Sequence, residues 1–219
     1  MSYPKVIFLD AVGTLFGVKG SVGQVYQTLS QQVGVAASAE ELDQAFYQSF
    51  ADADAMAFPN VSAVEIPHRE YLWWLAIAQE TFQRAGIFGQ FSDFEGFFEG
   101  VYQHFATAEP WLVYEDTVSS LKRWQRLGIP LGIISNFDSR IYAVLDALKL
   151  RQYFQTITIS TEAGAAKPDP LIFTTALRKH GCSASDAWHV GDSQKDDLTG
   201  AKVSGLQGIW LQRPPQSTS

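Results

Sequence analysis

The chain has 219 residues, a length that suits one well-packed domain carrying a smaller insertion and argues against two large separate domains. Hydrophobic residues make up 46% and charged residues 18%, which excludes the disordered and fibrous classes. The 16 basic and 23 acidic side chains leave a net charge of −7 without any cluster of lysines or arginines, so a nucleic acid is not an expected partner.

The first predicted element is a short buried strand over Val6–Leu9, because these residues are all apolar and two of them are β-branched. The strand ends at Asp10, and Gly13 and Thr14 follow at once as a loop signal. An aspartate after a strand is often only a turn residue or a helix N-cap, so Asp10 alone does not decide between structure and chemistry.

Residues 17–110 contain no convincing strand and are rich in glutamine and aromatic residues. We predict that they form an all-helical cap domain, inserted into a core made of residues 1–16 and 111–213, with hinges near the two crossings. Ser38 and Glu41 have the spacing of a capping box that starts one of the helices. The periodicity predicts helices over about 21–33, 38–54, 67–85 and 92–105.

The second half of the chain alternates between short apolar runs and segments with helical periodicity, which indicates repeated βαβ units. The predicted strands are Leu131–Ile134, Thr156–Ile159, Ala187–Val190 and Gly208–Leu211. The predicted helices are Asp116–Leu127, Ser139–Leu148, Pro170–His180 and Asp196–Ser204.

The predicted fold class is therefore α/β, a doubly wound parallel sheet of the Rossmann-like type with an inserted helical cap. In such a sheet ligands bind beyond the carboxyl ends of the strands. Asp10, Ser135, Thr161 and Asp192 all follow predicted strands and should lie at this edge. The polar tail, residues 214–219, is predicted to be disordered.

Four short motifs fall at the ends of predicted strands, and together, in this order, they resemble the motifs of the haloacid dehalogenase superfamily. Any one of them alone is weak, because each is also explained as a turn or a helix start. The motifs are Asp10-Ala11-Val12-Gly13-Thr14-Leu15, Ile134-Ser135-Asn136, Lys167-Pro168-Asp169-Pro170, and Gly191-Asp192-Ser193 followed by Asp197.

The resemblance implies a hydrolase in which Asp10 attacks phosphorus and forms an aspartyl-phosphate, a covalent intermediate that divides one difficult displacement into two easier ones. Asp192 and Asp197 are spaced so that both can approach one Mg²⁺, an ion that prefers carboxylates, water and substrate oxygens. Asp10 would share the ion, and the family pattern adds the backbone carbonyl of Val12. Asp196 is the neighbouring alternative to Asp197.

The remaining motif residues are expected to bind the substrate. Ser135 and Asn136 would hold the transferring group, and Lys167 would balance the crowded carboxylates, which otherwise raise one another's pKa values. Gly13 and Thr14 shape the first loop, whose backbone N–H groups could form an anion-binding nest.

Val12 departs from the usual phosphatase pattern, in which a second aspartate at this position protonates the leaving group. Positioned acid–base catalysis contributes about 10² to 10⁴ in rate. Glu162 could reach the site as a replacement, whereas His189 lies inside a predicted strand and is interpreted as a packing residue.

Three explanations of Val12 remain open. A 2-haloacid dehalogenase needs no such acid, but the fourth motif resembles a phosphatase, and the cap arginines, Arg69 and Arg84, lie well after the expected position. A phosphonate hydrolase needs a cap lysine, and none occurs between Lys19 and Lys122.

The third explanation is a branch of the superfamily whose own first motif lacks the aspartate. The chain resembles the branch named after a rhythmically expressed insect gene, in both the predicted cap and the predicted core. The segments that carry this resemblance are Phe58-Pro59-Asn60, Trp73-Trp74, Ser135-Asn136-Phe137-Asp138, Thr161-Glu162-Ala163-Gly164 and residues 167–173.

The sequence thus predicts a Mg²⁺-dependent phosphatase of a small phosphorylated metabolite, a monomer or homodimer. The alternatives are a dehalogenase-like hydrolase and a catalytically weakened module that binds a phosphorylated ligand or a protein. The single cysteine, Cys182, and the absence of a signal-like start at Met1–Lys5 predict a cytoplasmic protein. The longest apolar run, Leu72–Ala78, is too short to span a membrane, so no membrane partner is expected.

Overall fold

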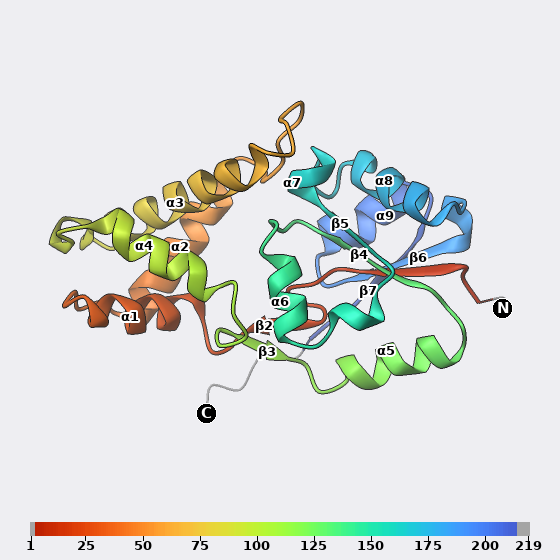
Figure 1. Ribbon diagram of the computed structural model, residues 1–219, viewed down its shortest axis with the longest axis horizontal. Coiled ribbons are helices and arrows are strands. Elements are labelled where there is room, and N and C mark those ends of the chain that lie inside the picture. The colour runs from red at the N-terminus through yellow and green to blue at the C-terminus, as the bar shows by residue number, and fades with distance from the viewer. Residues whose placement is uncertain (1–2, 214–219) are drawn as a thin grey trace.

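In the computed structural model, which describes residues 3–213, five parallel strands form one sheet in the order β5-β4-β1-β6-β7 (Figure 1). β1 pairs with β4 on one side and with β6 on the other. The strand order therefore reverses beside β1, where doubly wound sheets bind their ligands. The strands are β1 (Val6–Leu9), β4 (Leu131–Ser135), β5 (Thr156–Ile159), β6 (Ala187–Gly191) and β7 (Gln207–Trp210).

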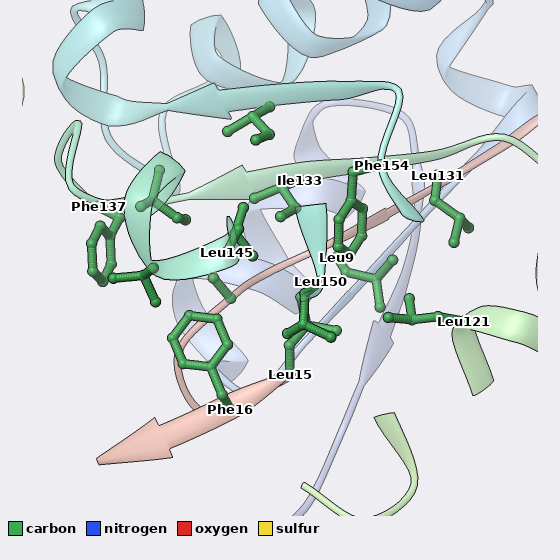
Figure 2. Packing of buried hydrophobic residues seen from close by; sticks show 14 of the residues in the cluster. Leu9, Leu15, Phe16, Leu121, Leu131, Ile133, Phe137, Leu145, Leu150 and Phe154 are labelled. Carbon is green, nitrogen blue, oxygen red and sulfur yellow. The ribbon is translucent and has the colours of Figure 1, made fainter. Parts of the chain in front are cut away.

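Alternating residues of β1 divide the core into two hydrophobic layers, one on each face of the sheet. Ile7 and Leu9 pack with the residues under α5 (Thr117–Arg126) and α6 (Ile141–Ala147), a layer drawn in Figure 2. Val6 and Phe8 pack on the opposite face. The helices that contribute to that second layer are α8 (Pro170–His180) and α9 (Gly200–Val203).

The predicted fold class is confirmed, and the structure differs from the prediction only in detail. A short helix, α7 (Ser160–Ala163), follows β5 directly. The helix predicted over Asp196–Ser204 is divided into a π-helix, η4 (Gln194–Thr199), and α9. Three short 3₁₀ helices complete the connections, η1 (Phe88–Gln90), η2 (Arg151–Tyr153) and η3 (Ala184–Asp186).

Four helices inserted after β1 form the cap, seen on the left of Figure 1. They enclose their own hydrophobic cluster, in which Phe82 lies fully buried among other aromatic rings. Ser38 caps α2 by accepting a hydrogen bond from the Glu41 N–H at 3.4 Å, as the capping-box spacing predicted. The cap helices are α1 (Val22–Gln32), α2 (Ala39–Asp52), α3 (Ile66–Arg84) and α4 (Phe94–His104).

The two chain crossings between core and cap form a small antiparallel ribbon of β2 (Phe16–Val18) and β3 (Trp111–Val113). The prediction that residues 17–110 contain no strand is wrong for the last two residues of β2, Gly17 and Val18, and β3, just after that range, was not predicted. The hinges expected at the two crossings stay a prediction. Each strand has only three residues and its partner lies far away in the chain, so no local periodicity announces it. The predicted domain boundaries at residues 17 and 110 stay a prediction, and residues 214–219 lie outside the described residues.

A buried carboxylate, Glu70 on α3, fastens the cap to the core. It accepts a hydrogen bond from the backbone N–H of Ser139 at 2.9 Å, one from the Ser139 hydroxyl, and one from the Thr161 hydroxyl at 2.6 Å. Its side chain is completely buried, and burial raises its pKa, although these hydrogen bonds act in the opposite direction. One turn further along α3, Trp74 Nε1 donates to Asp138 Oδ2 at 2.7 Å.

Within residues 3–213 no helix is both long enough and apolar enough to span a membrane.

Replacing Glu70 by alanine should lower the free energy of unfolding by about 2–4 kcal/mol, because the buried Thr161 hydroxyl and the two donors of the half-buried Ser139 lose their acceptor. Urea denaturation measures this loss. The matched control is Glu80→Ala on the same helix, which removes only the exposed ion pair with Arg84 and should cost at most about 0.5 kcal/mol. Equal losses in the two variants would refute the role of Glu70 in fastening the cap.

Candidate active site

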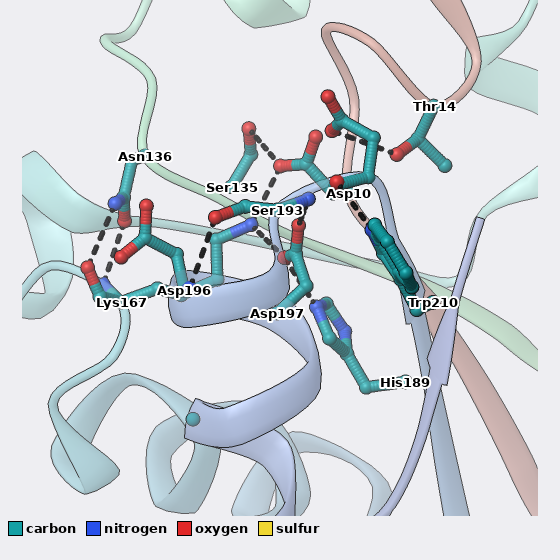
Figure 3. A network of polar contacts seen from close by, with 12 residues as sticks. Asp10, Thr14, Ser135, Asn136, Lys167, His189, Ser193, Asp196, Asp197 and Trp210 are labelled. Carbon is teal, nitrogen blue, oxygen red and sulfur yellow. Dashed lines mark hydrogen bonds and ion pairs between the residues drawn. The ribbon is translucent and has the colours of Figure 1, made fainter. Parts of the chain in front are cut away.

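Asp10 lies directly after β1, at the carboxyl end of the central strand, and its side chain is almost fully buried. The Ser135 hydroxyl donates to Asp10 Oδ1 at 3.0 Å, and Lys167 Nζ donates to the same oxygen at 2.6 Å (Figure 3). Both hydrogen bonds end on Oδ1. The first three motifs of the sequence therefore meet at one carboxylate.

Lys167 forms a second buried ion pair, with Asp197 Oδ1 at 2.6 Å. Burial alone would lower the pKa of this lysine, but the charges of Asp10 and Asp197 raise it above its ordinary value. The lysine is therefore a permanent cation that joins the carboxylate after β1 to the one in η4.

Asp10, Asp192 and Asp197 form one cluster, in which an oxygen from each lies within 4.8 Å of the others. Burial raises the pKa of Asp10 although the charge of Lys167 lowers it. Burial, followed by the charges of Asp10 and Asp197, raises the pKa of Asp192 to about 6. Burial would also raise the pKa of Asp197, but Lys167 and His189 lower it overall.

The cluster fits a divalent cation. Three carboxylates and one lysine carry a formal charge of −2, and burial lowers the pKa of His189, which keeps that ring neutral. Carboxylate oxygens are the donors that Mg²⁺ prefers. A divalent ion bound by Asp10, Asp192 and Asp197 would cancel this charge.

Two glycines allow the carboxylates to approach the backbone. A Cβ atom on Gly13, whose φ is +87°, would lie 2.3 Å from Asp192 Oδ2, and one on Gly191 would lie 2.1 Å from Asp197 Cγ. Any side chain at these positions would displace the acids. Thr14, next to Gly13, points its hydroxyl at Asp192 Oδ1 from 3.4 Å.

The π-helix η4 selects Asp197 over Asp196 for the cluster. Ser193 caps η4, accepting the Asp196 N–H at 3.0 Å with its hydroxyl and donating its own N–H to Asp197 Oδ2 at 2.9 Å. Asp196 is not part of the carboxylate group that could hold a metal, whereas Asp197 is.

Two of the predicted site residues, Asn136 and Val12, do not contact the carboxylates of the cluster through a side-chain hydrogen bond that the structure records. The Asn136 amide accepts the Lys167 N–H at 2.7 Å and donates to the Lys167 carbonyl at 3.0 Å. It thus holds the loop that carries the lysine, and its predicted contact with the transferring group stays a prediction. Val12 lines a cavity beneath the cap, and the predicted metal contact of its carbonyl also stays a prediction.

Sequence reasoning missed the role of His189. The ring is fully buried and packs edge-on against Phe173, as expected of a packing residue, but its Nε2 also lies 2.8 Å from Asp197 Oδ1. One signal for this contact was present in the sequence: His189 lies two residues before the end of β6, close to the edge of the sheet where Asp192 follows. Glu162, the other candidate acid, accepts hydrogen bonds from the Tyr142 hydroxyl and is exposed.

Comparisons with known proteins agree with this geometry. The family described as haloacid dehalogenase-like hydrolase matches residues 4–205. The haloacid dehalogenase-like hydrolase domain-containing protein 3 of Danio rerio is 31% identical over 94% of this chain and 84% of its own length. The rhythmically expressed gene 2 protein of Drosophila melanogaster is 27% identical over 92% of this chain and 80% of its own.

Among solved structures, a HAD phosphatase from Thermococcus onnurineus is 25% identical, with a TM-score of 0.60. The alignment covers 96% of this chain and 87% of the other.

Saturating Mg²⁺ should raise the thermal midpoint of the wild-type protein by about 5–10 °C, because an ion at 100 times its Kd stabilises a fold by about 2.7 kcal/mol. Asp192→Asn should lose most of this shift. Asp196→Asn, which changes the neighbouring acid outside the cluster, should keep it. Differential scanning fluorimetry with and without Mg²⁺ measures the thermal midpoints. A Mg²⁺-induced shift lost only in Asp196→Asn would contradict the assignment of Asp192 to the metal site.

Proposed function

Since the chain belongs to the haloacid dehalogenase-like hydrolases, we propose that it is a Mg²⁺-dependent phosphatase that acts on a small phosphorylated metabolite. The single observation that carries this proposal is the cluster of Asp10, Asp192 and Asp197 beside Lys167. A nucleophilic carboxylate, a site for a divalent cation and a fixed positive charge are what phosphoryl transfer requires.

In the first step Asp10 attacks phosphorus. Ser135 and Lys167 both bind Oδ1, so they fix the carboxylate in one orientation and leave Oδ2 to approach the substrate. The bound Mg²⁺ would neutralise the phosphoryl oxygens as charge redistributes. The oxygen–phosphorus bond to the leaving group breaks, and an aspartyl-phosphate forms on Asp10.

In the second step water attacks the phosphorus of this aspartyl-phosphate and frees Asp10. The half-buried Val12 stands where the family pattern places the acid that would assist both steps, so neither the leaving group nor the water is helped by that position. Slow turnover of substrates with strongly basic leaving groups follows from this substitution.

The comparison with the Thermococcus onnurineus protein supports this choice, since that relative is described as a HAD phosphatase. The dehalogenase alternative needs a free arginine for a substrate carboxylate. Arg84 is engaged with Glu80 and Asp52 on the cap surface, and Arg69 is exposed on the same helix. Neither arginine supports that alternative.

An aspartyl-phosphate should be trapped on Asp10. After brief incubation with Mg²⁺ and acetyl phosphate or 4-nitrophenyl phosphate, acid-quenched wild-type protein should carry one phosphoryl group, which peptide mass spectrometry places on the peptide that contains Asp10. Asp10→Asn should carry none. Asp146→Asn, a matched change on the exposed face of α6, should behave as the wild type.

Absence of both the phosphoprotein and any turnover, across a broad panel of phosphomonoesters, would refute the phosphatase and favour the weakened binding module. Release of halide from a 2-haloacid in the presence of a metal chelator would favour the dehalogenase.

Val12→Asp should raise kcat for alkyl phosphates by about 10² to 10⁴, because it restores an acid beside a leaving group that cannot depart without a proton. The gain for 4-nitrophenyl phosphate should be much smaller, since that leaving group departs as an anion. Steady-state kinetics with the two substrate types measure the difference. A uniform change for both types would show that Val12 is not at the leaving-group side of the site.

A further inference from the structure

An apolar cavity of about 260 Å³, open to solvent beside the exposed rings of Tyr47 and Phe50, lies between the cap and the core, next to the carboxylate cluster. Val12 and Asn136 form its wall on the catalytic side, the former two residues after the nucleophile and the latter directly after Ser135. Cap side chains line the opposite side, chiefly the aromatic rings of Phe46, Trp74 and Phe98. An apolar cavity of roughly 150 Å³ holds one benzene ring, so this one has room for a ring with a substituent.

Of the residues that the structure describes, Arg140 is the only charged one in the wall, and its charge is already neutralised. Asp138 binds its guanidinium through both oxygens, at 2.8 and 2.7 Å, and Asp138 itself is completely buried. The guanidinium also stacks 3.8 Å from the ring centre of Tyr102 and donates to that residue's carbonyl at 3.1 Å. The cavity therefore offers no free charge to a charged substituent, and burying one there would be costly.

Among residues 3–213 the cavity wall also offers no carboxylic acid or imidazole to protonate a leaving group. No aspartate, glutamate, histidine, lysine or cysteine lines it among residues 3–213. Burial raises the pKa of Tyr26 and of Tyr102, which makes these wall hydroxyls poorer acids than an ordinary tyrosine. The third wall hydroxyl, that of Tyr47, belongs to an exposed side chain. The cavity therefore favours a leaving group that can depart as an anion.

We propose that the cavity holds the leaving group of the substrate, and that this group is an uncharged ring of about benzene size attached to phosphate through a weakly basic oxygen. Aryl phosphates, enol phosphates of ring compounds and aromatic acyl phosphates share this chemistry. The proposal rests on the phosphatase function proposed above and adds the substrate class to it.

The reaction balances without an acid. Asp10 forms a bond to phosphorus, and the bonding pair of the broken phosphorus–oxygen bond leaves on the ring's oxygen as a phenolate, enolate or carboxylate. Water then attacks the aspartyl-phosphate, its two protons end on the released phosphate as H₂PO₄⁻, and Asp10 returns to a carboxylate. The dianionic ester thus yields two monoanions, and no other reactant is needed.

Two acyl phosphates form a matched test. Acetyl phosphate and benzoyl phosphate have leaving groups of similar acidity and differ mainly in the ring. With Mg²⁺, and after subtraction of the rate with Asp10→Asn, kcat/KM for benzoyl phosphate should exceed that for acetyl phosphate by at least about 100-fold, because a single extra methylene in a hydrophobic pocket is already worth about 10- to 200-fold and the ring is larger. Adding a para-carboxylate to the benzoyl ring should lower kcat/KM by at least about tenfold, since no free cation receives it.

Filling the cavity should remove the preference. Val101→Phe, on α4 in the cavity wall, should bring the benzoyl-to-acetyl ratio below about ten. Because Val101 is buried, its thermal midpoint is measured alongside. Val22→Phe, at the half-buried start of α1, is the second variant if the first does not fold.

The outcomes separate the two proposals. Turnover of both acyl phosphates at similar kcat/KM, lost in Asp10→Asn, would overturn the ring-binding cavity and leave the phosphatase standing. A ratio near 100 that both cavity variants leave unchanged would also overturn it. If neither acyl phosphate is hydrolysed in an Asp10-dependent way, the phosphatase proposal fails and this one fails with it.

Discussion

The buried ammonium group of Lys167, held between Asp10 and Asp197, is the contact on which the rest of the site depends. A buried cation without partners costs several kcal/mol, so the lysine can occupy this position only because both carboxylates are there. The two carboxylates in turn approach each other only because the lysine lies between them. This mutual requirement joins three segments that are far apart in the sequence, the loop after β1, the loop before α8 and the π-helix η4. The carboxylates also need Gly13 and Gly191 beside them, since side chains at those positions would displace Asp192 and Asp197.

The cap and the loop after β1 together make one side of the site apolar. Val12 and the aromatic rings of the cap line the same cavity beside the carboxylate cluster. Among the described residues the charge in its wall is that of Arg140, which is matched by Asp138. Glu70 and Trp74 fasten α3 to the same core loop, so the wall of the cavity and the junction between cap and core are built from neighbouring residues. The environment on the phosphate side is therefore charged and hydrogen-bonded, whereas that on the cap side is apolar.

The sequence predicted the parts of the molecule that local patterns encode. The strands Val6–Leu9 and Thr156–Ile159 and the helix Pro170–His180 have the predicted bounds, because apolar runs and a proline at the helix start are local signals. The ribbon of β2 and β3 was missed, since each short strand depends on a partner about a hundred residues away. Glu70 and His189 were missed for the same reason: a buried carboxylate or imidazole has a role only once the fold supplies its partners. The strand ends did predict that Asp10, Ser135 and Asp192 would lie together, because the carboxyl ends of parallel strands share one edge of the sheet, whereas Lys167 was expected there only from the resemblance.

The central claim is that the carboxylates of Asp10, Asp192 and Asp197 hold one divalent cation beside the nucleophile. Anomalous diffraction from crystals grown with Mn²⁺ in place of Mg²⁺ tests it most directly, because this scatterer reports its own position. A single strong peak is expected among these carboxylates, at about 2 Å from oxygens of Asp10 and Asp192. An empty cluster at saturating Mn²⁺, or a peak bound only by residues elsewhere on the surface, would contradict it.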